Sequence, residues 1–391
     1  MNIDLPGGAY TLREPVTWPA VECRVDAPAT SRVVYAAAHV VADPLGDNTP
    51  GSPAAVDWDA TLRFRRHLWS YGLRVADAMD TAQRNMGLDW AATRELIRRS
   101  AAEARAFGDP AELVACGAGT DHAPEAADLD AITAAYAEQL ETVQSTGAGI
   151  IIMASRQLAR VARGPKDYHQ VYGKLFGLAD RPVILHWLGE MFDPQLAGYW
   201  GSRAVPAATE AFLELIHAHA PLVDGVKVSL LDEEHEVGLR AALPAGVRLY
   251  TGDDFNYPSL IRSGSHALLG IFDAIAPAAA AALRALDSAE AAGDEADRDR
   301  LLAAYDEILA PTVPLSRKIF ETPTYNYKTG IVFLAWLNGH QDAFTMVNGA
   351  QSARSLTHLA EVFRLADQAG LLADQERAVH RMKALLAVHG R

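Results

Sequence analysis

The chain contains little cysteine: only Cys23 and Cys116 occur among its 391 residues. The two cysteines lie in different segments and lack the short spacing of a CxxC pair. A disulfide scaffold and a zinc site of the CxxC type are therefore excluded. Such sparing use of cysteine is typical of a reducing compartment, and we expect a cytoplasmic protein.

The sequence also lacks the segments that export or membrane insertion requires. The first residues, MNIDLPGGAYTLREP, show no basic region followed by an apolar core, so no signal peptide is predicted. Charged residues interrupt every apolar run well before it reaches membrane-spanning length. The formal net charge of −14 disfavours nucleic acid or an anionic membrane as a partner.

What the chain does contain is a regular alternation of short apolar runs and amphipathic stretches. Helical periodicity is clear in residues 57–72, 128–147 and 206–220, which lie between apolar runs. Strands that alternate with helices in this way predict a parallel sheet, and eight such units close into a (β/α)8 TIM barrel of the α/β class. The eight predicted strands are 32–41, 72–80, 112–119, 149–155, 182–188, 225–231, 247–254 and 266–275.

The pattern divides the chain into three parts. We predict a short N-terminal extension (1–30), the barrel (31–280) and a C-terminal helical region (281–391). In the third part, an acidic stretch broken by glycine near 287–298 predicts a loop between two helices. The segment KTGIVFLAWLNG (328–339) is almost wholly apolar, and we expect it to be buried against the barrel or another subunit. From this apolar surface we predict a homo-oligomer.

Polar residues collect where the predicted strands end, which is where TIM barrels place their reactive groups. A packed barrel centre does not need so many polar side chains, so we predict a polar site there for a small-molecule substrate. The candidates are His39, Asp80, Thr81, Gln83, His122, Ser155, His186, Glu190, Lys227, Ser229, Asp254 and Asp273.

Lys227 is the most unusual of these residues because it interrupts an apolar strand, DGVKVSLLDEE (224–234). Strand alternation places Val226 and Val228 on the face toward the helices and Lys227 on the face toward the barrel interior. An amine in apolar surroundings has a lowered pKa and can attack a carbonyl carbon. The alternatives are a structural salt bridge to Asp253 or Asp254, or a side chain that reaches out to solvent.

His186 follows an apolar run at another strand end. It could act as a general acid or base, bind a metal, or be a hydrogen-bonded core histidine. Asp254, after YTG, could bind a substrate hydroxyl, and either Asp254 or Asn256 could cap the next helix. The sequence CGAGTDH (116–122) does not have the GxGxxG spacing of a dinucleotide site.

A divalent metal such as zinc or manganese is an alternative to cofactor-free chemistry. The ligands available at the strand ends would be His39, His122, His186 and Glu190. These residues are scattered along the chain and include no HExxH pair. We therefore expect no cofactor and keep the metal as the alternative.

The order of these motifs resembles the dihydrodipicolinate synthase / N-acetylneuraminate lyase superfamily of Schiff-base aldolases, over roughly residues 32–280. Residues 225–232, 247–256 and 265–277 resemble its strand-six lysine, strand-seven Gly-Asp-Asp and strand-eight segments. The resemblance implies that Lys227 is the Schiff-base nucleophile. It also places His186 where the family has a proton-relaying tyrosine. As a whole, the chain looks like a divergent bacterial branch of unknown function.

The departures from the family concern substrate binding. Asp80–Thr81 stands where the family has two threonines that bind a 2-keto acid, and a carboxylate at that position disfavours pyruvate. We therefore expect a class I aldolase or lyase, distinct from true dihydrodipicolinate synthase, that acts on a sugar-derived carbonyl compound. The expected substrate-binding residues are Asp80, Thr81, Gln83, His122, Ser155, Ser229, Asp254 and Asp273.

Two other functions are compatible with the same pattern. One is a metal-dependent lyase, isomerase or epimerase that acts on a sugar at the same barrel mouth. The other is a non-catalytic sugar-binding or regulatory protein, although the number of ionisable residues at the strand ends favours an enzyme.

Overall fold

The computed structural model describes residues 1–15 and 28–391, so Cys23 lies outside the described residues, while Cys116 is a buried free thiol. The predicted barrel is confirmed: parallel strands close it in the order β10-β3-β4-β5-β6-β7-β8-β9. Seven of these strands lie within their predicted runs, and β8 begins slightly earlier. Their bounds are β3 (Val34–Ala37), β4 (Arg74–Asp77), β5 (Val114–Ala118), β6 (Gly149–Ile152), β7 (Val183–Leu188), β8 (Val223–Ser229), β9 (Arg248–Thr251) and β10 (His266–Leu269).

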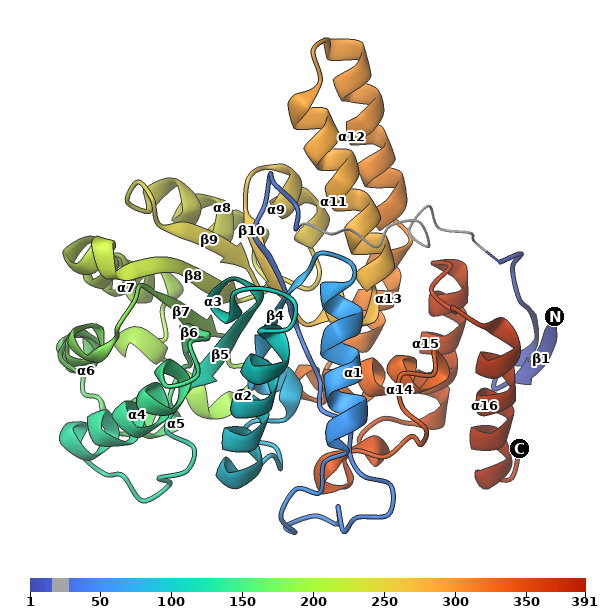
Figure 1. The fold of residues 1–391 in the computed structure, drawn as a ribbon, viewed down its shortest axis with the longest axis horizontal. Helices are drawn as coiled ribbons and strands as arrows, with labels where there is room; N and C mark the ends of the chain where they lie inside the picture. Colours follow the sequence, from blue (N-terminus) through green and yellow to red (C-terminus); the bar gives the residue numbers. More distant parts are fainter. Residues whose placement is uncertain (16–27) are drawn as a thin grey trace.

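Helices surround the barrel, as Figure 1 shows. Aspartates cap several of them: the side chains of Asp57, Asp89, Asp128 and Asp232 each accept a hydrogen bond from a first-turn N–H group. The helices predicted at 57–72, 128–147 and 206–220 are α1, α4 and α7. The helices of this layer are α1 (Trp58–Trp69), α2 (Trp90–Ala104), α3 (Pro110–Leu113), α4 (Leu129–Gln144), α5 (Arg156–Val161), α6 (Pro165–Leu178), α7 (Val205–His219), α8 (Glu233–Ala242) and α9 (Tyr257–Arg262).

The barrel strands divide their side chains between two cores. Val226 and Val228 of β8 belong to the core between the strands and the helices. A separate interior core contains Ile184 of β7. Since side chains alternate along a strand, His186 shares the interior face with Ile184, and Lys227 pairs in register with His186. The interior orientation predicted for Lys227 is therefore confirmed.

Beyond the barrel the chain is helical, as predicted. The helices α11 and α12 pack against each other as a hairpin that projects from the body in Figure 1. Their connection at residues 292–294 lies within the acidic stretch predicted to be a loop. This part comprises α10 (Ile271–Ala274), α11 (Ala276–Ala291), α12 (Glu295–Leu309), α13 (Thr312–Ile319), α14 (Tyr327–Leu337), α15 (Leu356–Gln368) and α16 (Gln375–Val388).

The helix α14 is the apolar segment of the sequence, and every one of its residues is buried. It packs against α10, α13, α15 and α16 of its own chain. The predicted burial is confirmed, but within one subunit, so α14 offers no exposed apolar face to a second copy. The homo-oligomer stays a prediction without that argument.

The N-terminal residues form a hairpin of β1 (Asn2–Leu5) and β2 (Gly8–Thr11). The hydroxyl of Tyr10 donates to the carboxylate of Asp367 in α15 at 2.8 Å, so the hairpin is attached to the C-terminal helices. Among the described residues, no helix combines the length and the apolar character that crossing a membrane requires.

Candidate active site

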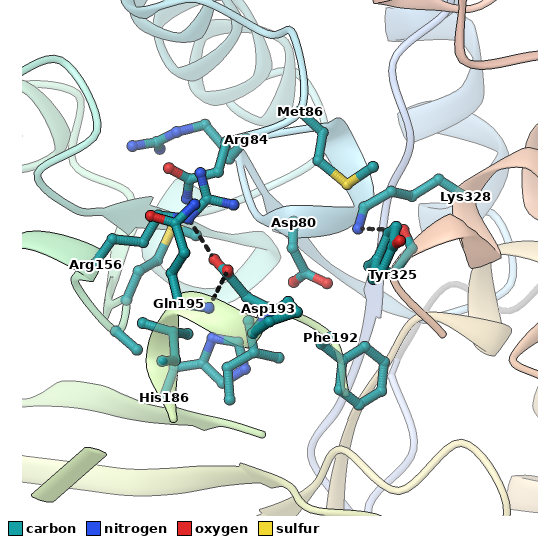
Figure 2. Close-up of a pocket in the computed structure, with 16 residues that line it drawn as sticks. Asp80, Arg84, Met86, Arg156, His186, Phe192, Asp193, Gln195, Tyr325 and Lys328 are labelled. Atoms are coloured by element: carbon teal, nitrogen blue, oxygen red, sulfur yellow. Dashed lines mark hydrogen bonds and ion pairs between the residues drawn. The ribbon is translucent and has the colours of Figure 1, made fainter. Parts of the chain in front are cut away.

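A cavity of about 340 Å³ lies where the loops after β4, β6 and β7 meet the N-terminal end of α14. Its size is within the range of small-molecule sites. Figure 2 shows acidic, basic and amide side chains converging on it. The labelled lining residues are Asp80, Arg84, Met86, Arg156, His186, Phe192, Asp193, Gln195, Tyr325 and Lys328.

Lys227 lies in the barrel interior close to this cavity and is only 5% exposed. Its amine forms no hydrogen bond or direct ion pair with any residue of the described chain, which argues against the structural salt bridge. Burial lowers the pKa of Lys227 below 10.5, although the carboxylates of Asp80 and Asp254 oppose this shift. A buried amine with a lowered pKa and no partner suits a nucleophile.

The backbone beside Lys227 makes room for its side chain. A Cβ atom added at Gly252, just after β9, would come within 2.9 Å of Lys227 Cε and 2.1 Å of Ser229 Oγ. A larger residue at position 252 would thus displace the lysine. Ser229, a predicted substrate-binding residue, is buried at the end of β8 next to this glycine.

His186 lies opposite Lys227 on the neighbouring strand β7 and lines the cavity. Its ring is fully buried, and neither ring nitrogen has a hydrogen-bond partner among the described residues. A hydrogen-bonded core histidine is therefore not what the structure shows. Burial, with a contribution from Lys227, lowers the pKa of His186 well below 6.5 against the opposing effect of Asp80. The imidazole is neutral at neutral pH and can accept a proton.

Asp80 lies in the short helix η2 (Asp80–Ala82) after β4 and lines the cavity. The Tyr327 hydroxyl donates to its Oδ2 atom at 2.7 Å, and its Oδ1 atom is buried with no partner in the described chain. Burial raises the pKa of Asp80, but Lys227, Lys328, His186 and the Tyr327 hydrogen bond outweigh it and bring the value to about 2. Asp80 is therefore ionised.

Thr81 is also close to the site, and its side chain contacts Tyr327. Its Oγ1 atom and the Tyr327 hydroxyl lie 2.7 Å apart. The tyrosine thus joins α14 to both residues of the loop after β4. This contact fixes the C-terminal helices over one side of the cavity.

Asp254, after β9, is buried and has a different charge state from Asp80. Its Oδ1 atom accepts a hydrogen bond from the backbone N–H of Ile271 at 2.8 Å. Burial raises the pKa of Asp254 to about 8, so its carboxyl group is protonated at neutral pH and can donate a proton. Asn256, one of the two predicted caps, holds the N-cap position of α9 (Tyr257–Arg262), although its side chain makes no cap hydrogen bond. Asp253 accepts from the N–H groups of Phe255 and Asn256 in the loop before this helix.

The structure places Gln83 and Ser155 in structural roles outside the cavity lining. The Gln83 side chain donates to the carbonyl oxygen of Val347 at 2.9 Å. Ser155 caps α5, where its Oγ atom accepts from the N–H of Leu158 at 3.0 Å. Neither residue contributes a side chain to the cavity lining.

Asp273 and His122 also lie elsewhere. The Asp273 carboxylate is bonded to His39, accepting from its backbone N–H at 2.8 Å and lying 2.7 Å from its Nδ1 atom. The His122 ring lies 3.2 Å from the Glu138 carboxylate and 2.8 Å from the side-chain amide of Gln139. These two candidates are not brought to Lys227.

The alternative metal ligands do not come together. His39 lies with Asp273, His122 with Glu138, and the exposed Glu190 lines a different cavity from His186. Within residues 1–15 and 28–391, no three His, Cys, Asp or Glu side chains are arranged to hold a metal ion.

Lys328 was missed by sequence reasoning, although it lines the cavity and is only 3% exposed. Its Nζ atom donates to the carbonyl oxygen of Tyr325 at 3.2 Å and lies 4.4 Å from the centre of the Tyr327 ring. Burial lowers the pKa of Lys328 to about 8, against the opposing effects of Asp80 and Asp193. The signal was a lone lysine in an otherwise apolar helix.

Comparison with known protein families identifies the family of this chain. A family model described as "Protein of unknown function (DUF993)" matches residues 4–391. The chain belongs to the DUF993 family. No curated protein matches its sequence.

Solved structures of the dihydrodipicolinate synthase family share the fold. The enzyme from Aquifex aeolicus is 12% identical with a TM-score of 0.63, covering 87% of this chain and 99% of its own. The chloride-inhibited enzyme from Acinetobacter baumannii, complexed with pyruvate, is 14% identical with a TM-score of 0.62, covering 88% and 100%. A prophage protein of this family from E. coli K12, also in complex with pyruvate, is 14% identical with a TM-score of 0.63. The match covers 88% of this chain and 100% of the prophage protein. At these identities the likeness establishes the fold.

Proposed function

We propose that this DUF993 protein is a class I aldolase or lyase that binds a carbonyl compound as a Schiff base on Lys227. The observation that carries this proposal is a buried, unpartnered amine of lowered pKa on the barrel interior, opposite the neutral imidazole of His186. Two structures of the same fold hold pyruvate, a small carbonyl compound, which supports a carbonyl substrate.

The charge states of the site support imine formation. The unprotonated form of the Lys227 amine, which its lowered pKa makes more abundant, attacks the carbonyl carbon, and a proton passes from the amine nitrogen to the carbonyl oxygen to give a hydroxyl group. The protonated carboxyl of Asp254 donates the second proton that lets this hydroxyl leave as water. The positive iminium that remains is stabilised by the ionised Asp80, which interacts electrostatically with Lys227.

Bond cleavage then needs a base. His186 accepts the proton of a substrate hydroxyl, the adjacent carbon–carbon bond breaks, and its electron pair enters an enamine on Lys227. Protonation of the enamine carbon and hydrolysis by water release the product and restore the amine. In a lyase that breaks a carbon–oxygen bond, His186 instead removes a carbon proton, the freed electron pair forms the new double bond, and the adjacent hydroxyl group takes up a proton and leaves as water.

The proposed substrate is sugar-derived and differs from that of true dihydrodipicolinate synthase. Hydroxyl groups have several hydrogen-bonding partners around the cavity, including the carboxylates of Asp80 and Asp193 and the amide of Gln195. An ionised Asp80, which interacts with Lys227, disfavours a 2-keto acid, whose carboxylate would lie directly beside the carbonyl group bound to Lys227.

Borohydride trapping tests this proposal. The full chain is incubated with borohydride and a panel of keto-sugars, sugar acids and 2-keto acids, and the intact mass and the modified peptide are measured. We expect a reduced adduct on Lys227 that is absent in Lys227→Met and retained in Lys383→Met, which changes an exposed lysine of α16. Turnover that survives in Lys227→Met would exclude the proposal.

A further inference from the structure

The amine of Lys328 has donors to spare. An ammonium group carries three N–H donors, and one of them is used by the carbonyl oxygen of Tyr325. No other hydrogen bond joins Lys328 to a described residue, although its side chain is almost fully buried and lines the cavity. The remaining donors are therefore available to a partner inside the cavity.

Arg156, the first residue of α5, also faces the cavity with unused donors. Its Nε atom donates to Asp193 at 2.6 Å, and its terminal amino groups have no hydrogen-bond partner in the described part of the chain. Figure 2 shows Lys328 and Arg156 entering from different sides, with Asp80 and Asp193 between them. The two cations line the same cavity, and Arg156 contributes to lowering the pKa of Lys328.

The charges around the cavity do not balance once the substrate has formed its iminium. Arg84 is neutralised by Asp121. Asp80 and Asp193 then face three cations: the iminium on Lys227, the Lys328 ammonium and the Arg156 guanidinium. One negative charge on the substrate makes this set neutral, which matters because charges interact strongly in a buried site.

We propose that the cavity binds an oxyanionic group of the substrate, a carboxylate or a phosphate, between Lys328 and Arg156. A guanidinium can bind such a group through two parallel hydrogen bonds, while an ammonium supplies a compact charge. Lys227 binds the carbonyl carbon while Lys328 and Arg156 bind the oxyanion, so the two groups occupy different parts of one molecule. The part of this inference that concerns the substrate's carbonyl group rests on the proposed function. With the oxyanion added, the substrate class is an anionic sugar derivative.

Binding of three six-carbon probes without a free carbonyl tests the oxyanion site separately from imine chemistry. The probes are glucitol, gluconate and glucitol 6-phosphate, titrated into the full chain by calorimetry at neutral pH. We expect gluconate or glucitol 6-phosphate to bind on the order of tenfold more tightly than glucitol. The anion that binds identifies the source as a carboxylate or a phosphate.

Variants assign the effect to the two cations. Lys328→Met and Arg156→Gln should each remove the preference for the anion, whereas Lys328→Arg and the surface control Lys383→Met should retain it. Arg156 is partly exposed, so its variant remains informative if Lys328→Met fails to fold. Equal affinity for glucitol and both anions, or an anion preference unchanged in both neutral variants, overturns the inference.

The same titrations separate this inference from the proposed function. Anion preference without any borohydride adduct on Lys227 would exclude the Schiff-base proposal and leave the oxyanion site standing. An adduct on Lys227 with no anion preference would exclude the oxyanion site and leave the Schiff-base proposal standing.

Discussion

Two buried lysines approach one cavity from different parts of the molecule, and their surroundings differ. Lys227 comes from the strand β8, and its amine has no hydrogen-bond partner in the described chain. Lys328 comes from α14, and its amine has a carbonyl oxygen at 3.2 Å and an aromatic ring face below it. Carbonyl groups and ring faces favour the ammonium form. Under the proposed function, Lys227 of the barrel is the nucleophile and Lys328 of the C-terminal helices is a cation.

The two lysines therefore differ in their surroundings and hardly at all in their burial. Both side chains are nearly inaccessible, and burial lowers the pKa of both. Asp80 acts on both amines and raises both pKa values. What distinguishes the two lysines is the set of hydrogen-bonding groups that each amine can reach.

Replacing one lysine at a time should have the largest effects and should separate the roles of the two lysines. Lys227→Met should reduce kcat/KM by roughly 10⁴-fold or more, because the nucleophile is lost. Lys328→Met should raise KM for an anionic substrate while a neutral carbonyl compound still forms an adduct on Lys227. Steady-state kinetics together with peptide mapping measure both effects. Equal losses of kcat in the two variants would contradict the division of roles.

Asp80→Asn should have the next largest effect because both lysines share this carboxylate. Loss of the charge that stabilises the iminium should lower kcat by roughly 10²- to 10³-fold. Asp80 raises the pKa of both lysines, so its removal should move the ascending limb of trapping at Lys227 to lower pH. Trapping rates measured across pH test this shift. An ascending limb that stays in place would show that Asp80 does not act on Lys227.

Asp254→Asn should change the alkaline side of the pH profile. The carboxyl of Asp254 is protonated below its pKa of about 8 and loses its proton as the pH rises through that value, so general-acid catalysis declines. The variant should lower kcat by roughly 10²-fold and abolish this decline. The matched control is Asp253→Asn, which alters the neighbouring carboxylate that caps the loop. A decline near pH 8 that persists in Asp254→Asn would assign it to another group.

Tyr327→Phe should have a smaller effect, because it keeps the ring next to Lys328 and removes only the hydroxyl. Asp80 then loses the hydrogen bond that lowers its pKa. We expect the free energy of unfolding to fall by about 1 kcal/mol and kcat to fall by about tenfold or less. Denaturant unfolding and kinetics measure the two effects. Unchanged stability would show that the contact between α14 and the loop after β4 contributes nothing measurable.

Chelation should have the smallest effect. The described residues bring no three potential ligands together, so treatment with EDTA should leave the activity unchanged. A loss of activity that is restored by added zinc or manganese would favour the metal-dependent alternative.

The sequence was informative about the barrel because strands have a strong local signal. Apolar runs of strand length, each followed by a helix, left little choice of fold, and alternation along β8 placed Lys227 inward. Position at a strand end was less informative. It did not tell whether the following loop turns a side chain toward the cavity, as at Asp80, or into a structural hydrogen bond, as at Gln83 and Asp273.

Lys328 could not be assigned to the site in the same way. About a hundred residues of chain separate it from Lys227, and only the packing of α14 over the barrel brings the two together. Helical periodicity predicted a buried helix but not which strand ends it would cover. The one local signal, a charged residue in an apolar helix, identified a residue that needs a partner and could not say which partner.

A crystal structure of the protein after borohydride trapping with its best substrate tests the central claim most directly. If Lys227 forms the Schiff base, continuous electron density should run from its Nζ atom into the reduced adduct, and the Lys328 amine should lie within hydrogen-bond distance of the ligand's oxyanion. Density joined to Lys328, or a ligand held by a metal ion with Lys227 unmodified, would contradict this claim.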